Sequence, residues 1–170
     1  MEVMLLYNKA LDPNHTLLRM TALLIYWKAE ILEIDALRLF DFLIANPAHI
    51  QKLSVPRNKF TDKNEFKSYM NRYQNFDPKS LFNAMKEIHF LAIERLVVLG
   101  VLQKDNNSSE YQVILENIPE GLKSLAESKE NSISSQAIDF IVENLISISI
   151  TGSDGLKKIT SLMDYRYDVN

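Results

Sequence analysis

The chain has 170 residues, of which 46% are hydrophobic and 24% are charged, with a formal net charge of −3, which predicts one globular domain with its own core. It contains no cysteine, which excludes disulfides, thiol catalysis and thiolate metal sites. No apolar run approaches the roughly 20 residues that span a bilayer, and the N-terminus carries an acid at position 2, so we expect a cytoplasmic protein without signal peptide or membrane anchor.

Two helices are predicted in the first part of the chain. Asp12 is a helix N-cap, Pro13 fits the first turn, and apolar residues then recur at helical spacing as far as about Lys28. Asp35 is predicted to cap a second helix, which is apolar almost all round. Pro47 ends it, because the residue before a proline is disfavoured in the helical region.

Further helices are predicted in the middle of the chain. Asp62, with Glu65 three residues later, forms an approximate capping box. Asp77 and Pro78 repeat the first cap and open a long helical segment that runs to Leu99. The sequence leaves open whether this segment is one helix or a short helix followed by a longer one.

A β-hairpin is predicted after the long helical segment. Gly100 is a natural helix stop, residues 101–104 read as a short strand, and a polar turn leads to the alternating, β-prone residues 111–115. This order of helix, glycine, strand, turn and strand indicates a winged helix, in which a hairpin wing follows the last helix of a helix-turn-helix core.

Three helices are predicted at the C-terminal end. Pro119 introduces a short one, and Ser134 or Ser135 caps an amphipathic one over residues 136–150. A further amphipathic segment covers residues 156–167.

The predicted fold is therefore mainly α, as a single domain with three parts. A winged-helix core with a small β-hairpin wing covers residues 35–117, an N-terminal helical extension covers residues 1–34, and C-terminal helices cover residues 118–170.

One charge pair interrupts the apolar second helix. Arg38 and Asp41 lie three residues apart, which places them on one helix face and allows them to pair. Two roles are open for this pair: it fixes how the helix packs in the fold, or it makes a polar contact to a partner subunit.

The residue inventory does not supply a catalytic centre. His15, His49 and His89 lie in separate segments without metal-binding spacing, and we interpret them as helix-end or surface residues. Four glycines and no nucleotide-binding motif argue against a phosphate-cradling loop. We therefore expect no enzyme activity, metal, cofactor or small-molecule substrate.

Nucleic-acid binding is weakly supported by charge. The candidate reading helix, residues 85–99, has a net charge of zero, and the wing, residues 103–110, has a net charge of −1, whereas phosphate contacts need several cations. The basic segment over residues 51–73, with interleaved aromatic residues, is the better candidate for weak contacts with DNA. The same pattern is also expected of a solvated helix face whose aromatic residues point into the core. The cations of this segment are Lys52, Arg57, Lys59, Lys63, Lys67 and Arg72.

A family resemblance covers the N-terminal quarter of the chain. The pattern "LYNKALDPNHTLLRMTALLIY", followed by "IDALRLFDFLIANPAHI", resembles the middle component of bacterial ABC-three-component systems, which include Lamassu-type antiphage defence with its LmuC-like subunit. The resemblance implies an accessory subunit that joins and restrains an SMC- or Rad50-like ATPase and an effector, often a nuclease, with DNA bound indirectly or weakly and no membrane contact. The alternative is a stand-alone winged-helix transcriptional regulator that binds DNA itself.

Overall fold

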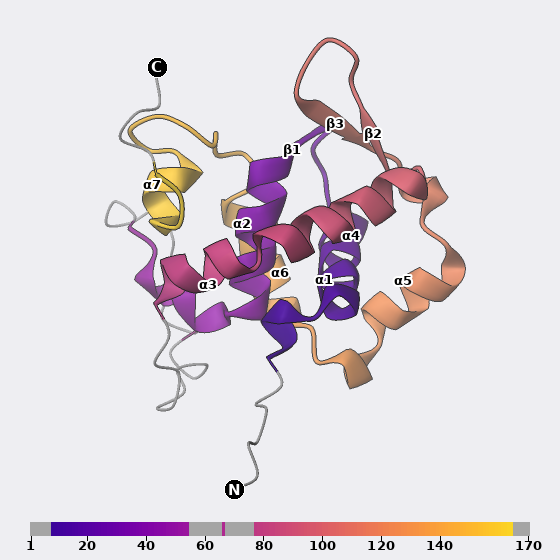
Figure 1. Ribbon diagram of the computed structural model, residues 1–170, viewed down its shortest axis with the longest axis horizontal. Helices are drawn as coiled ribbons and strands as arrows, with labels where there is room; N and C mark the ends of the chain where they lie inside the picture. The colour runs from indigo at the N-terminus through magenta and orange to yellow at the C-terminus, as the bar shows by residue number, and fades with distance from the viewer. Residues whose placement is uncertain (1–7, 55–65, 67–76, 165–170) are drawn as a thin grey trace, which may run out of the picture.

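A computed structural model describes residues 8–54, 66 and 77–164 of the chain (Figure 1). Within these residues the protein is mainly helical, with one three-stranded antiparallel sheet. The predicted mainly-α class is confirmed, and the arrangement is consistent with a winged-helix-like fold.

The described elements follow one another along the chain in two groups. The first comprises η1 Lys9–Leu11, α1 Pro13–Ile25, β1 Ile31–Glu33, α2 Ile34–Ala45 and η2 Pro47–Lys52. The second comprises α3 Pro78–Ala84, α4 Lys86–Val98, β2 Leu102–Lys104, β3 Glu110–Val113, η4 Leu115–Asn117, α5 Glu120–Glu127, η5 Lys129–Asn131, α6 Ser135–Asn144 and α7 Leu156–Thr160.

Local capping chemistry explains where most helices begin. The Asp12 side chain accepts hydrogen bonds from the backbone N–H of Asn14 and His15 at the start of α1. Asp77 starts α3 and Ser134 starts α6 in the same way. These three predicted caps are confirmed.

Some predicted boundaries are wrong. Glu33, not Asp35, is the N-cap of α2; Asp35 lies in the first turn, where a carboxylate is favoured by the helix dipole. The α6 helix ends at Asn144 and α7 at Thr160, well short of the predicted segments.

Two further helical predictions concern the segment that begins at Pro78 and the capping box at Asp62. The long segment that begins at Pro78 consists of two helices, α3 and α4, with Met85 between them. The predicted capping box of Asp62 and Glu65 lies outside the described residues.

The sheet joins the hairpin to a strand that the sequence did not reveal. Its order is β1-β3-β2, and Leu32 pairs with Tyr111 while Leu102 pairs with Val113. β1 was missed because three residues are too few to show alternation. Through β1, the segment before α2 contributes to the predicted winged-helix core.

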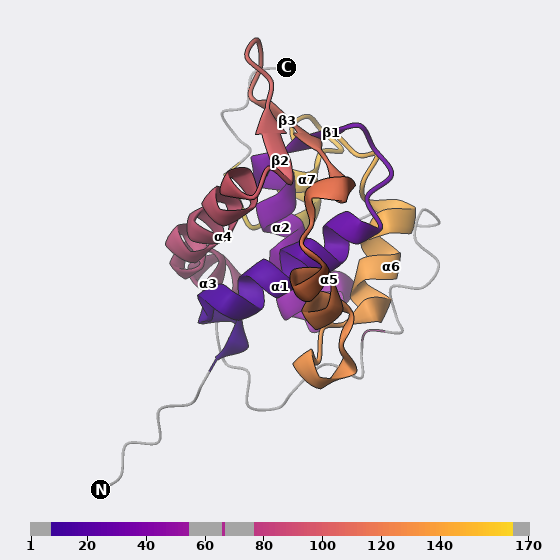
Figure 2. The ribbon, with the colours of Figure 1, turned by 90° about the vertical axis from the view of Figure 1, so that its right-hand side faces the viewer.

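The core is built around α2. Figure 1 shows α3 and α4 running end to end in front of α1, α2 and α6, and Figure 2 shows α1 between α4 and α5. One cluster of buried apolar side chains includes residues of α1, α2, α4, α6 and α7. Among the described helices, none combines the length and apolarity needed to cross a bilayer.

Candidate functional site

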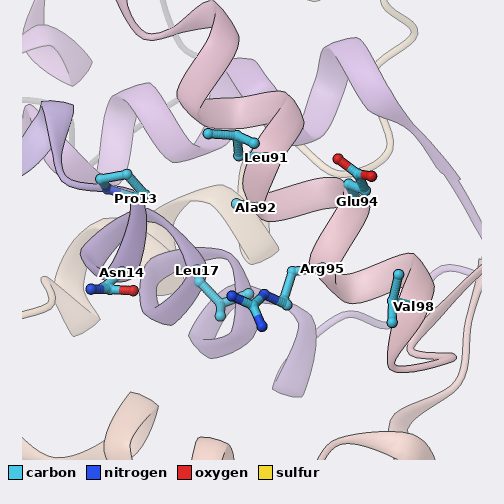
Figure 3. Close-up of a pocket in the computed structure, with 8 residues that line it drawn as sticks. All are labelled: Pro13, Asn14, Leu17, Leu91, Ala92, Glu94, Arg95 and Val98. Atoms are coloured by element: carbon cyan, nitrogen blue, oxygen red, sulfur yellow. The ribbon is translucent and has the colours of Figure 1, made fainter.

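A groove of about 360 Å³ lies between the N-terminal half of α1 and the outer side of α4 (Figure 3). Its floor and walls are mainly apolar, with Glu94 and Arg95 as its charged members. In Figure 3 the Arg95 side chain extends from α4 toward α1, whereas Glu94 points away. The lining residues are Pro13, Asn14, Leu17, Leu91, Ala92, Glu94, Arg95 and Val98.

The sequence of α4 places apolar side chains on both its inner and outer faces. The buried positions recur at helical spacing and pack into the core: His89, Ala92, Ile93 and Leu96. The outer face carries Phe90, Leu91, Val97 and Val98. Leu91 is 56% exposed and Val98 is 77% exposed, so α4 presents uncovered apolar surface beside the groove.

The charges on the same helix cancel. Lys86 and Arg95 are balanced by Glu87 and Glu94 on the exposed side of α4. A helix that docks in the major groove of DNA needs a cationic surface toward the phosphates. An apolar, neutral outer face instead fits contact with another protein, since the cores of protein interfaces are depleted in charge.

A buried ion pair joins α1 to α2. Arg19 Nε lies 2.8 Å from Asp41 Oδ1, and Arg19 Nη2 lies 3.0 Å from Oδ2, with Arg19 only 1% exposed. The other N–H groups of Arg19 donate to the Lys9 carbonyl, His15 Nδ1 and Thr16 Oγ1. All five guanidinium donors are thus satisfied, which is what a buried arginine requires.

Two histidines extend this network in opposite directions. His15 Nε2 lies 2.7 Å from the Asn131 carbonyl, so it donates there while Nδ1 accepts from Arg19, which requires a neutral ring. His89, on α4, is fully buried, and its Nε2 lies 3.0 Å from Asp41 Oδ2. The polar network therefore ties α1, α2, α4 and η5 together.

The pKa of Asp41 reflects these contacts. Burial alone would raise the pKa of this carboxyl, but the charge of Arg19 and the hydrogen bonds from His89 and Arg19 hold it below its ordinary value. Asp41 is therefore ionised in the folded protein. Burial lowers the pKa of His15, in keeping with its neutral ring.

The comparison with known families identifies the family to which the chain belongs. The family model described as ABC-three component (ABC-3C) system Middle Component 5 matches residues 5–168. The chain belongs to this family. No curated protein and no solved structure matches it significantly. Because the match spans α1 to α7, the groove and the buried network both lie within the Middle Component 5 region.

The predicted pairing of Arg38 with Asp41 in this middle component is wrong. Asp41 binds Arg19 and His89, whereas Arg38 Nη1 lies 3.3 Å from Asp35 Oδ1. Asp35 and Asp41 are each three residues from Arg38, so either could pair with it on one helix face. Asp41 is buried in the core, however, where Arg19 forms two hydrogen bonds with its carboxylate. Which role Arg38 and Asp41 have, structural or in partner binding, stays a prediction.

Only one of the predicted DNA-contacting cations can be located. Lys52 is an exposed residue at the end of η2. The other five lie outside the described residues: Arg57, Lys59, Lys63, Lys67 and Arg72.

The interpretation of the histidines as helix-end or surface residues fails for His89. This residue lies inside α4 and is fully buried. Its helical spacing with the apolar Ala92, Ile93 and Leu96 was the sequence signal that could have predicted its burial. Among residues 8–54, 66 and 77–164, no group of three or more histidines and carboxylates could hold a metal ion. The network joins an arginine, a carboxylate and two histidines from three helices. His89 Nδ1 is buried without a hydrogen-bond partner among the described residues, but the bonds of Arg19 and Asp41 across the helices favour a role in positioning them.

Proposed function

We propose that this middle component is a non-catalytic subunit that joins an SMC- or Rad50-like ATPase to a nuclease effector and restrains the effector, as part of Lamassu-type antiphage defence. In this proposal the groove between α1 and α4 receives a helix of a partner subunit. DNA is contacted through the partners rather than by α4.

The observation that carries the proposal is the uncovered apolar outer face of α4. Leu91 and Val98 line the groove two helical turns apart, and the charged side chains between them, Glu94 and Arg95, cancel each other. A groove with apolar walls accepts the apolar face of an amphipathic helix, whose own anchor residues recur at i, i+3, i+4 and i+7. Membership of a three-component family supports the existence of protein partners.

Co-purification tests the proposal. The chain, the ATPase and the effector encoded beside it are expressed together, and the chain is captured through an affinity tag. We expect both partners to be retained by the unmodified chain. Leu91→Asp should reduce recovery of at least one partner by roughly 10-fold or more, because it places a charge in a buried interface position.

Leu125→Asp is a matched control for this variant. Leu125 lies on α5 outside the groove and is 55% exposed, almost the same as Leu91 at 56%. Equal losses for both variants, or no retention of either partner by the unmodified chain, would overturn the proposal.

Direct DNA binding is the outcome that would favour the alternative, a transcriptional regulator. Binding of the isolated chain to random duplex DNA is measured over a range of salt concentrations. A regulator gives measurable affinity that falls steeply with salt, since each phosphate contact releases counterions. We expect little binding at any salt concentration.

A further inference from the structure

A second pocket, of about 310 Å³, lies on the side of the molecule where α2, α3 and α7 meet. It is lined by four cationic side chains from four helices and one carboxylate. The lining residues are Arg38, Lys79, Phe82, Asn83, Lys86, Lys157, Leu162, Met163 and Asp164. The formal charge of this lining is therefore strongly positive, in contrast to the net charge of −3 for the whole chain.

Arg38 is the unusual member of this pocket. Its side chain is only 6% exposed, and its guanidinium carbon lies 4.8 Å from the ring centroid of Phe82 and 5.3 Å from that of Phe90. The two rings hold the guanidinium plane through cation–π contacts. The aromatic contacts and the burial hold this side chain in one position. A solvated surface arginine is not preorganised in this way.

Part of the Arg38 guanidinium lacks an acceptor among the described residues. Nη1 donates a hydrogen bond to Asp35 Oδ1, but Nε is buried and has no hydrogen-bond partner among the described residues. A buried, unsatisfied donor on a cation is costly unless an acceptor reaches it. Nε and Nη2 lie on the same edge, and together they can donate to two oxygens of one oxyanion.

The lysines favour a doubly charged anion over a carboxylate. Lys86 has no ion-pair partner among the described residues. Lys79 is paired with Asp164 at 2.9 Å, but the two side chains are 47% and 78% exposed, so water screens this pair and a ligand can replace it. With Asp35 beside Arg38 and Asp164 beside Lys79, the four cations keep a formal net charge of +2. A phosphate group carries up to two negative charges near neutral pH and matches this balance better than a single carboxylate does.

We propose that this pocket binds the phosphate group of a small molecule, with Arg38 donating through its Nε and Nη2 edge and Lys79 and Lys86 supplying charge. The phosphate comes either from inorganic phosphate or from a nucleoside monophosphate. In this proposal the phosphate is a bound ligand.

Calorimetric titration of the purified chain tests this proposal independently of any partner subunit. Inorganic phosphate, AMP and adenosine are the probes, and glutarate serves as a dicarboxylate comparison. We expect saturable binding of inorganic phosphate or of AMP, with no binding of adenosine and weaker binding of glutarate. Tighter binding of AMP than of phosphate would identify a nucleotide as the source of the phosphate group.

Variants locate the binding in the pocket. Arg38→Lys keeps the charge but loses the two-donor edge, and Lys79→Ala combined with Lys86→Ala removes two exposed cations without touching the core. Each should weaken binding by roughly 10- to 100-fold. Lys123→Ala, on α5 at the opposite side of the molecule, is the matched control and should change nothing (Figure 1).

Three results would overturn the proposal. They are the lack of saturable binding by both phosphate and AMP, glutarate binding as tight as phosphate binding, and equal weakening by Lys123→Ala and the pocket variants. The lysine double variant keeps the test decisive if Arg38→Lys does not fold. These results leave the proposed role in partner assembly untouched, because the test uses the isolated chain.

Discussion

Arg19 and Asp41 form a two-bond ion pair in the interior of the protein, between helices α1 and α2. The Arg19 Nε and Nη2 atoms lie 2.8 Å and 3.0 Å from the two Asp41 oxygens, and His89 of α4 reaches the same carboxylate. Three helices of the core therefore meet at one side chain. Because these groups are shielded from water, each depends on the others for its hydrogen bonds.

The first prediction is that Asp41→Ala strongly destabilises the fold. Removal of the carboxylate leaves the Arg19 charge buried without its partner, and we expect the free energy of unfolding to fall by about 3–5 kcal/mol. Urea unfolding followed by far-UV circular dichroism measures this change. The double variant Arg19→Met, Asp41→Leu should lose less unfolding free energy than the sum of the losses for Arg19→Met alone and Asp41→Leu alone. The reason is that the double variant leaves neither charge of the pair buried without its partner. Additive losses would contradict this account.

The second prediction concerns the other carboxylate of α2. Asp35 pairs with Arg38 at 3.3 Å, but the Asp35 side chain is 42% exposed. Arg38 is only 6% exposed, but the amide oxygen introduced by Asp35→Asn can still accept its hydrogen bond, so we expect the free energy of unfolding to change by less than about 1 kcal/mol. The same urea experiment compares it with Asp41→Asn. An equal effect of the two variants would mean that burial does not distinguish the two ion pairs.

The third prediction is a loss of stability in weak acid. Burial lowers the folded-state pKa values of His15 and His49 below their ordinary value of 6.5, so the unfolded chain binds more protons in this range. The stabilisation from neutral rings is complete above pH 6.5 and is lost as the pH falls below it. Unfolding free energies measured from about pH 7.5 to about pH 5.5 should decline.

Removal of the two rings provides the control for this pH dependence. His15→Gln combined with His49→Gln should flatten the decline in that range, whatever its effect on stability at neutral pH. An unchanged slope in the double variant would assign the pH dependence to other groups. Asp41 contributes separately and only at much lower pH, since its lowered pKa means that its stabilisation is lost on protonation below its ordinary value of 3.8.

The fourth prediction concerns the glycine between α4 and the wing. Gly100 has a φ of +76°, and an added Cβ would lie 3.0 Å from Asn117 Nδ2, which donates to the Gly100 carbonyl. Gly100→Ala should therefore lower the free energy of unfolding by about 1–2 kcal/mol. Gly121→Ala is the matched control, because Gly121 lies in α5 with open space around it. It should stabilise the protein by up to about 1 kcal/mol.

The parts of the fold that depend on neighbours in the chain could be predicted from the sequence. Asp12, Asp77 and Ser134 each satisfy backbone N–H groups two or three residues away, and Gly100 adopts the positive φ that ends α4. Pro47 limits α2 through its own ring. Such signals act over one turn of helix, so they are visible in a short window of sequence.

The candidate site was only partly predictable. The sequence identified the helix that carries Leu91 and Val98 and its zero net charge, but could not separate interface residues from core residues. That separation depends on which side of α4 the helix α1 covers. The acidic partner of Arg38 shows the same limit, because Asp35 and Asp41 are equally distant in sequence and only burial decides between them.

The helical class, the main caps, the hairpin and the resemblance to a middle component were all predictable from the amino-acid sequence. The shared buried network of Arg19 in α1, Asp41 in α2 and His89 in α4, and the position of Arg38 in a cationic pocket, were found only in the folded structure. Helix caps are bonds between near neighbours, whereas this network depends on packing between residues 22 or 48 positions apart, which no local pattern records.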